Sequence, residues 1–250
     1  MALELGIGAP LTAALVAGYG VRGRSSPLFG PNLWRGPREK RQIALTFDDG
    51  PSEATLPLLE LLELYSARAT FFQCGKNVER LPEVSRRVQD GGHEIGNHTY
   101  SHPRLLGCTP SRIREEIGRT QQAISRAAGT APRLFRAPYG IRWFGLRPVL
   151  RQFGLTGVMW TVIAYDWEWE ADEIAWHVIS HASNGAIICM HDGDRVSERV
   201  DRRNTIRALR RILPELAGLG YCFVTAREMM DPRAPENSSA QNPGKASSPA

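Results

Sequence analysis

Two short groups of acidic and imidazole side chains are the residues best suited to chemistry in this chain. Asp48 and Asp49 end the apolar run 42–47, and His98 and His102 follow about fifty residues later. Side chains alternate along an extended backbone, so neighbouring carboxylates point in different directions. One carboxylate can therefore bind a metal ion with the two imidazoles while the other faces a bound water. A hydrolase needs this combination.

The spacing of the two histidines brings both imidazoles within reach of one ion. Pro103 disfavours helix at the preceding His102, so a compact loop is expected there. With one aspartate the pair makes a two-histidine, one-carboxylate set with open positions, which suits catalytic zinc and also other transition metals. Taken separately, the two groups have plainer explanations. Asp-Gly-Pro is common turn chemistry, and two histidines can simply lie on the surface.

Five sequence motifs, in order, resemble those of the polysaccharide deacetylase family. This family is carbohydrate esterase family 4, with the NodB homology domain, and contains metal-dependent N-deacetylases such as the chitooligosaccharide deacetylases. The matches span most of the chain, from about residue 43 to 225. Five matches in the family's order are far more specific than any one of them. The motifs are Thr46-Phe47-Asp48-Asp49-Gly50, His98-Thr99-Tyr100-Ser101-His102, Arg136-Ala137-Pro138-Tyr139-Gly140, a partial match at Tyr165-Asp166-Trp167, and Ile187-Ile188-Cys189-Met190-His191-Asp192-Gly193.

The resemblance implies which residues hold the metal and which removes a proton. Asp49, His98 and His102 would bind one divalent ion, with zinc as the first choice and cobalt or another transition metal as alternatives. Asp48 would act as general base toward the attacking water. Arg136 would pair with Asp48, hold its orientation and keep it ionised.

The resemblance also implies an acid and a substrate pocket. His191 would be the general acid that protonates the departing amine, with Asp166 setting its orientation and pKa. The backbone N–H of Tyr139 would stabilise the oxyanion. Trp167 would line the pocket for the acetyl methyl group.

Two positions depart from the family pattern. Ile163 stands three residues before Asp166, where the family usually has an acidic or small polar residue. Cys189 stands two residues before His191, where leucine is common, and we count it among the residues that line the substrate pocket. Neither position is a metal ligand, base or acid. Hydrolysis is therefore expected. Ile163 and Cys189 would instead alter the acyl pocket or the choice of substrate.

The function implied by the resemblance is removal of an N-acyl group, acetyl first, from an amino sugar in a glycan, oligosaccharide or lipid-linked saccharide. An amide or imide hydrolase or a deformylase of the same superfamily is an alternative. A non-catalytic carbohydrate-binding protein is another, and the retained base and acid argue against it. The net charge of +5 suits an anionic cell-wall polymer, a lipid surface or nucleic acid. No nucleic-acid partner is expected, because the basic residues are dispersed and no nucleic-acid fold motif accompanies them.

The order of elements indicates how these residues are positioned. A chain of 250 residues with 42% hydrophobic content is ample for one barrel-sized core. Repeated strand–helix units imply parallel strands, and active sites of parallel barrels lie at the carboxyl ends of the strands. We therefore predict an α/β fold, a distorted (β/α)7-type barrel in a single domain. Strands are expected near 42–47, 69–74, 94–97, 133–136, 156–164, 186–190 and 221–225, and helices over 56–65, 82–90, 110–128, 146–153, 172–180 and 202–217.

The catalytic domain is expected at residues 41–231, between an N-terminal segment, 1–40, and a disordered tail, 232–250. The tail is rich in Pro, Ser, Ala and Asn. Residues 5–19 are largely apolar but shorter than the ~20 residues of a spanning helix, and they fit equally a stretch that associates weakly with a membrane and a frayed or surface-packed segment. No basic region precedes that stretch, which argues against a cleavable signal peptide. The sequence leaves open a cell-envelope or cytoplasmic location and the oligomeric state.

Overall fold

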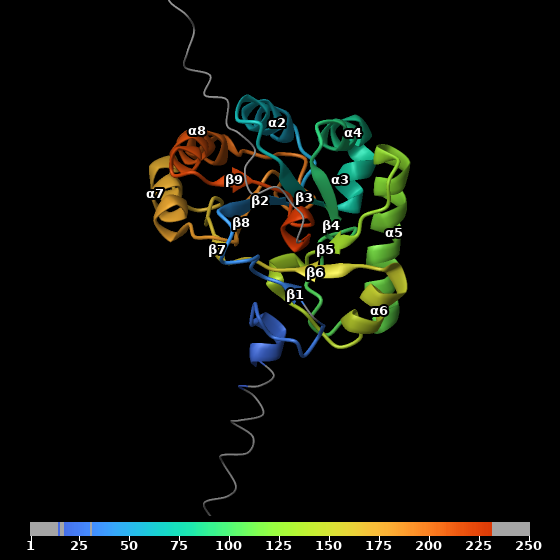
Figure 1. The fold of residues 1–250 in the computed structure, drawn as a ribbon. Helices are drawn as coiled ribbons and strands as arrows, with labels where there is room; N and C mark the ends of the chain where they lie inside the picture. The colour runs from blue at the N-terminus through green and yellow to red at the C-terminus, as the bar shows by residue number, and fades with distance from the viewer. Residues whose placement is uncertain (1–14, 16–17, 31, 232–250) are drawn as a thin grey trace, which may run out of the picture.

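The computed structural model describes residues 15, 18–30 and 32–231, and they contain one nine-stranded sheet rolled into an open barrel (Figure 1). Every strand pair is parallel, in the order β1-β6-β5-β4-β3-β2-β8-β7, with β9 beside the start of β2. The strands are β1 Asn32–Leu33, β2 Gln42–Asp48, β3 Ala69–Gln73, β4 Glu94–Asn97, β5 Leu134–Phe135, β6 Thr156–Val158, β7 Val162–Ile163, β8 Ala186–His191 and β9 Cys222–Phe223.

Helices lie around the outside of the strands, as expected for strand–helix repeats (Figure 1). The predicted (β/α)7-type barrel of the α/β class is thereby confirmed. The helices are α2 Thr55–Leu64, α3 Gly75–Arg80, α4 Pro82–Asp90, α5 Pro110–Ala128, α6 Leu146–Phe153, α7 Ala171–His181 and α8 Arg203–Gly218, with 3-10 turns at Pro138–Gly140 and Glu228–Met230.

Local sequence signals explain where the helices begin and end. The Thr109 hydroxyl accepts a hydrogen bond from the Arg112 N–H at the start of α5, and Gly129 ends that helix in the left-handed region at φ 76°. Helix α7 begins one residue earlier than predicted, because Glu170 and Glu173 form a capping box around its first turn.

The prediction of one strand over residues 156–164 is wrong. The structure has two strands there: β6 pairs with β1 and β5, whereas β7 pairs with β8. The Met159 N–H bonds to the Leu33 carbonyl and the Thr161 N–H to the Ile187 carbonyl, so the chain changes partners within three residues. A continuous apolar run carries no signal of such a change. The short helix α3 was also missed.

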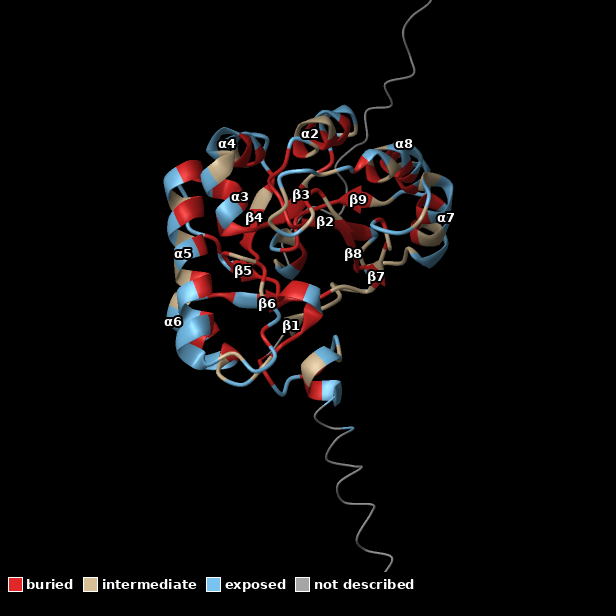
Figure 2. Ribbon diagram, turned by 180° about the vertical axis from the view of Figure 1, so that it is seen from behind, coloured by how far each residue is buried: buried red, intermediate tan, exposed pale blue. Residues whose placement is uncertain are grey.

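The strand register sorts side chains into an outer and an inner face. Side chains such as Leu45, Phe47 and Ile188 belong to the large core cluster shared with the helices. On the inner face, Ala44 and Ile187 pack in an apolar layer at the amino-terminal end of the barrel. The inner positions become polar toward the carboxyl ends of the strands, and buried residues run throughout the sheet (Figure 2).

The described part of the N-terminal segment packs against the barrel. Strand β1 adds to β6, and Phe29 is buried against the Phe144 ring at 4.9 Å between centroids. No helix among the described residues is long and apolar enough to cross a membrane. Most of residues 5–19 and the tail 232–250 lie outside the described residues, so the expectations for both segments stay predictions.

Candidate active site

The candidate site lies at the carboxyl ends of the strands. Asp48 ends β2 and His191 ends β8, and the two residues are direct partners in the β2–β8 register. Two residues earlier on each strand, Thr46 and Cys189 are also register partners, and their side chains lie on the same inner face of the sheet. A parallel register therefore places residues that are 143 positions apart in sequence side by side.

The three residues expected to bind metal converge on one point. Each offers a ligand atom, and these atoms lie within 4.8 Å of one another. Asp49 Oδ1 is 3.3 Å from His98 Nε2 and 3.0 Å from His102 Nε2, and all three side chains are buried. The segment from His98 to His102 is a loop, as Pro103 predicted.

This cluster fits a divalent cation. Asp49 Oδ1 is buried and has no hydrogen-bond partner among the described residues, although it faces two imidazoles. His98 Nδ1 donates to the Arg136 carbonyl at 2.8 Å, which fixes the tautomer and leaves Nε2 with a lone pair. The other Asp49 oxygen accepts the Arg195 N–H at 2.8 Å and is thereby oriented. Two imidazoles and one carboxylate are a ligand set used by catalytic zinc and other transition metals.

Asp48 is held by a buried arginine. Arg136 donates to Asp48 Oδ1 and to the Thr46 hydroxyl, both at 2.7 Å, and its guanidinium carbon lies 4.2 Å from the centroid of the Phe72 ring. Arg136 is fully buried, so the pair is shielded from solvent and carries two opposite charges in a low-dielectric interior. The carboxylate is fixed toward the cavity as an acceptor.

His191 is oriented by a second buried carboxylate. Asp166 accepts the His191 ring N–H at Nδ1, 2.8 Å away, and the His191 backbone N–H at 2.9 Å. Thr205 on α8 donates to the same aspartate at 2.8 Å, a contact that the sequence did not predict. Burial lowers the pKa of His191, but the charge and hydrogen bond of Asp166, with the charges of Asp49 and Asp48, raise it to about 9. His191 is therefore protonated at neutral pH.

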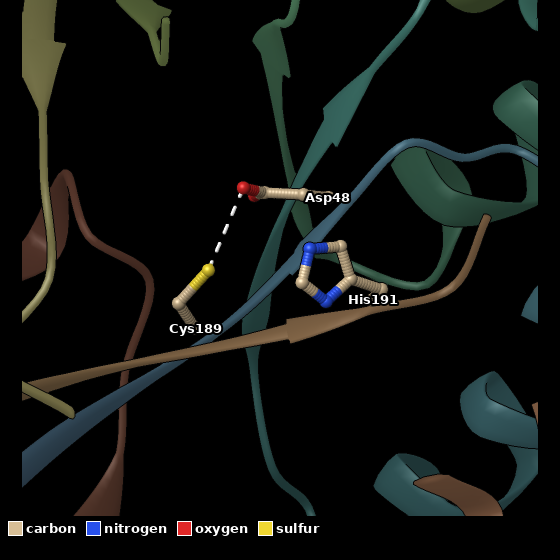
Figure 3. A group of neighbouring side chains, drawn as sticks. All are labelled: Asp48, Cys189 and His191. Carbon is tan, nitrogen blue, oxygen red and sulfur yellow. Dashed lines mark hydrogen bonds between the residues drawn. The ribbon is translucent and has the colours of Figure 1, made fainter. Parts of the chain in front are cut away.

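Cys189 lies two residues before the end of β8, and its thiol points toward Asp48 (Figure 3). Cys189 also lines the cavity over these groups. Its thiol donates to Asp48 Oδ2 at 3.5 Å, while Arg136 occupies the other oxygen. Burial, followed by the negative charge of Asp48, raises the pKa of this thiol well above its usual range. Cys189 is thus a neutral side chain in the wall beside Asp48 and His191.

The cavity over these groups has a volume of about 710 Å³. The Tyr139 ring lies 4.7 Å from the His102 ring, and the Trp167 ring stands edge-on to His191 at 5.2 Å, both half exposed. Ile163, where the fourth motif departs from the family pattern, also lines the cavity. Sequence reasoning missed several lining residues that belong to no motif: Arg22, Arg24, Met159, Trp160, Asp194, Arg195 and Arg202.

The backbone at the site is unusual. Seven non-glycine residues of the described chain have positive φ, and six of them lie in or beside the cavity. Thr99, between the two histidines, is β-branched, for which this region is strongly disfavoured. The six residues are Asp49, Thr99, His102, Tyr139, Tyr165 and Arg195. Left-handed backbone thus turns both Asp49 and His102 toward one point.

Sequence comparisons agree with the motifs and the geometry. The family model described as polysaccharide deacetylase matches residues 35–158. A peptidoglycan-N-acetylglucosamine deacetylase from Bacillus cereus is 36% identical over 204 residues, which covers 78% of this chain and 70% of the relative. A chitooligosaccharide deacetylase from Azorhizobium caulinodans is 35% identical, covering 74% of this chain and 93% of the relative. The chain belongs to the polysaccharide deacetylase family. The expected resemblance is confirmed, and the names of these relatives agree with the expected polysaccharide N-deacetylase.

Solved structures support the same assignment. A peptidoglycan N-acetylglucosamine deacetylase superposes with a TM-score of 0.74 at 35% identity, covering 79% of this polysaccharide deacetylase and 92% of that chain. A family 4 carbohydrate esterase from Streptomyces lividans, in complex with acetate, gives 0.67 at 40% identity, covering 73% and 91%. A Bacillus anthracis pseudoenzyme of the family gives 0.73 at 28% identity, covering 79% of this chain and 68% of that one. Since the fold also occurs in a pseudoenzyme, the argument for a specific reaction depends on the site.

Proposed function

We propose that this protein is a zinc-dependent deacetylase of N-acetylglucosamine residues in cell-wall glycan. The observation that supports the proposal best is the joint geometry of two groups. A three-ligand cluster, Asp49, His98 and His102, lies beside a base–acid pair whose two members, Asp48 and His191, are register partners. The relatives named as deacetylases of peptidoglycan and chitooligosaccharide supply the substrate class.

Each residue near the cavity takes one part of the hydrolysis. A divalent ion bound by Asp49, His98 and His102 would polarise the acetyl carbonyl and lower the pKa of a water. Asp48 accepts the proton of the attacking water, and the hydrogen bond from Arg136 holds Asp48 aimed into the cavity.

The acid acts on the other side of the scissile bond. His191 donates its proton to the departing amine from Nε2, because Nδ1 is engaged by Asp166. The Tyr139 N–H stabilises the oxyanion. Trp167 and Cys189 form the wall of the pocket that receives the acyl group.

The test is acetate release from N-acetylglucosamine oligomers and from peptidoglycan, by protein stripped of metal and then reloaded with zinc or cobalt. We expect no turnover after stripping and restored turnover after reloading with zinc. Sugar binding without metal-dependent turnover would instead indicate a carbohydrate-binding protein. Turnover restricted to cyclic amides, imides or N-formyl sugars would indicate another activity of the superfamily.

The pH dependence follows from the protonation of His191. Because its pKa is raised to about 9, the acid stays protonated below that pH, and activity should fall as the pH rises through it. Burial lowers the pKa of His191, and Asp166 is the main group that raises it. The pKa of His191 should therefore fall in Asp166→Asn. The alkaline limb of the kcat/KM profile should therefore move to lower pH. The matched variant Asp172→Asn, which removes an exposed carboxylate on α7, should leave that limb in place. An unmoved limb in Asp166→Asn would contradict the role of His191.

Cys189 should set the tolerance for acyl groups. Replacing the thiol by the larger leucine side chain fills space beside Trp167, so Cys189→Leu should preserve acetyl hydrolysis while reducing that of longer acyl groups. One methylene in such a pocket is worth roughly 1–3 kcal/mol of discrimination. Competition between N-acetyl and N-propionyl glucosamine oligomers measures the effect. An unchanged acyl preference would mean that Cys189 only packs between the strands.

A further inference from the structure

A short N-terminal segment, residues 18–30, forms part of the cavity wall although it precedes the region matched by the family model. In Figure 1 it is the blue stretch next to β1. Arg142 anchors the segment: its buried guanidinium donates to the Ser26 carbonyl at 2.8 Å and to the Gly23 carbonyl. Arg142 follows the turn that carries Tyr139, so the anchor ties the segment to the mouth of the site.

The segment brings two arginines to the cavity. Arg22 and Arg24 both line it and are exposed. Arg24 donates to the backbone carbonyls of Trp160, at 3.4 Å, and Thr161. These acceptors are neutral, so they orient the guanidinium without cancelling its charge. Across the described part of the chain, no carboxylate forms an ion pair with either arginine.

Arg24 also lies near other positive charges of the N-terminal region, outside the cavity. Burial lowers the pKa of Arg35, and the neighbouring positive charges of Arg38 and Arg24 lower it further. The three carboxylates that line the cavity are already engaged: Asp48 pairs with Arg136, Asp49 lies against His98 and His102 in the proposed metal cluster, and Asp194 lies 3.2 Å from Arg195. The uncompensated charge at Arg22 and Arg24 therefore faces whatever occupies the cavity.

We propose that Arg22 and Arg24 bind a carboxylate on the sugar next to the N-acetylated sugar that is hydrolysed. Guanidinium groups match carboxylates in geometry and bind them through charge-assisted hydrogen bonds. A glycan that alternates N-acetylglucosamine with N-acetylmuramic acid presents a lactyl carboxylate on that neighbouring sugar wherever no peptide is attached to it, whereas a chitin oligomer presents none. The inference depends on the proposed deacetylase function and narrows its substrate to the carboxylate-bearing glycan.

The experiment compares three substrates of similar length: a peptide-free strand of the alternating glycan, the same strand with its carboxylates converted to methylamides, and a neutral N-acetylglucosamine oligomer. The wild-type enzyme should prefer the acidic strand. In Arg22→Gln/Arg24→Gln, kcat/KM on that strand should fall at least about tenfold, mainly through KM, as charge-assisted hydrogen bonds are lost. The two neutral substrates should change less than about twofold, a loss typical of exposed charges. Raising the salt concentration should weaken the preference only in the wild type.

Arg86→Gln/Arg87→Gln is the matched control, because it removes two exposed positive charges from α4, away from the cavity. It should change none of the three activities. An equal loss on all three substrates in the Arg22/Arg24 variant would make the segment purely structural and overturn the proposal. Equal wild-type rates on the acidic and methylamide strands would also overturn it, while turnover of the neutral oligomer would still support the deacetylase function.

A phosphate is the other anionic group that two arginines could bind. An N-acetylglucosamine oligomer carrying 6-phosphate groups tests whether Arg22 and Arg24 bind a phosphate in place of a carboxylate. A greater dependence on Arg22 and Arg24 for this oligomer than for the acidic strand would overturn the assignment to a carboxylate. A smaller dependence would support it.

Discussion

Asp49→Asn and His98→Ala should each lose bound metal and reduce deacetylation by more than about 10³-fold, because activation of water and polarisation of the carbonyl are each worth several kcal/mol. The asparagine amide offers the ion only a neutral oxygen in place of a charged carboxylate, and alanine at position 98 offers no ligand, so each variant should hold the ion poorly. Asparagine is the better replacement at position 49, since φ there is 76° and asparagine tolerates the left-handed region, whereas alanine does not. Elemental analysis after dialysis and acetate release measure the two effects.

His181→Ala is the control for this prediction. His181 is exposed at the end of α7, so its loss should change neither metal content nor rate. Thermal unfolding of all variants separates a lost ligand from a lost fold. Full metal occupancy in Asp49→Asn and His98→Ala would show that the ligands are misassigned.

Asp48→Asn should keep its metal and still lose about 10²–10⁴-fold in kcat, the contribution of a positioned general base. The amide has the shape of the carboxylate and can still accept from Arg136 through its oxygen, but it cannot take the proton of the water. The metal ligands are untouched, because Asp48 Oδ2 is 3.9 Å from His98 Nε2, farther than Asp49 Oδ1 at 3.3 Å.

The measurement is kcat and metal content for wild type, Asp48→Asn and Asp90→Asn. Asp90 is an exposed carboxylate at the end of α4, so its amide should be neutral in both assays. A change of less than about tenfold in Asp48→Asn would argue against a base at this position, since such a base contributes at least about 10². Loss of metal in that variant would make Asp48 a ligand.

The sequence predicted the parts of the site that are encoded locally. Asp48 and Asp49 close an apolar run, and the two histidines share a five-residue loop, so residue type and spacing sufficed. The sheet followed because each buried strand is a short apolar segment bounded by turns.

Other features depend on contacts between distant segments. Arg24 reaches backbone carbonyls 136 and 137 positions away, and any residue can supply a carbonyl, so no side-chain pattern announces the contact. The Thr205 hydroxyl reaches the Asp166 carboxylate across 39 positions, and only the packing of α8 against the strand ends brings these two side chains together. The division of residues 156–164 into β6 and β7 likewise depends on pairing, since β6 pairs with β1 and β7 pairs with β8. Strand propensity along the chain does not encode which strands pair.

The left-handed residues around the cavity bear on how such a site could be transplanted. Each non-glycine residue held there costs of the order of 1–3 kcal/mol, and only a scaffold that over-determines the backbone maintains it. Grafting the aspartates and histidines onto another parallel barrel would copy the side chains without the turns that aim them. A functional graft would therefore have to include each strand end together with the loop that follows it. Selection for thermal stability alone would favour glycine or asparagine at these positions and so erode the alignment of the ligands.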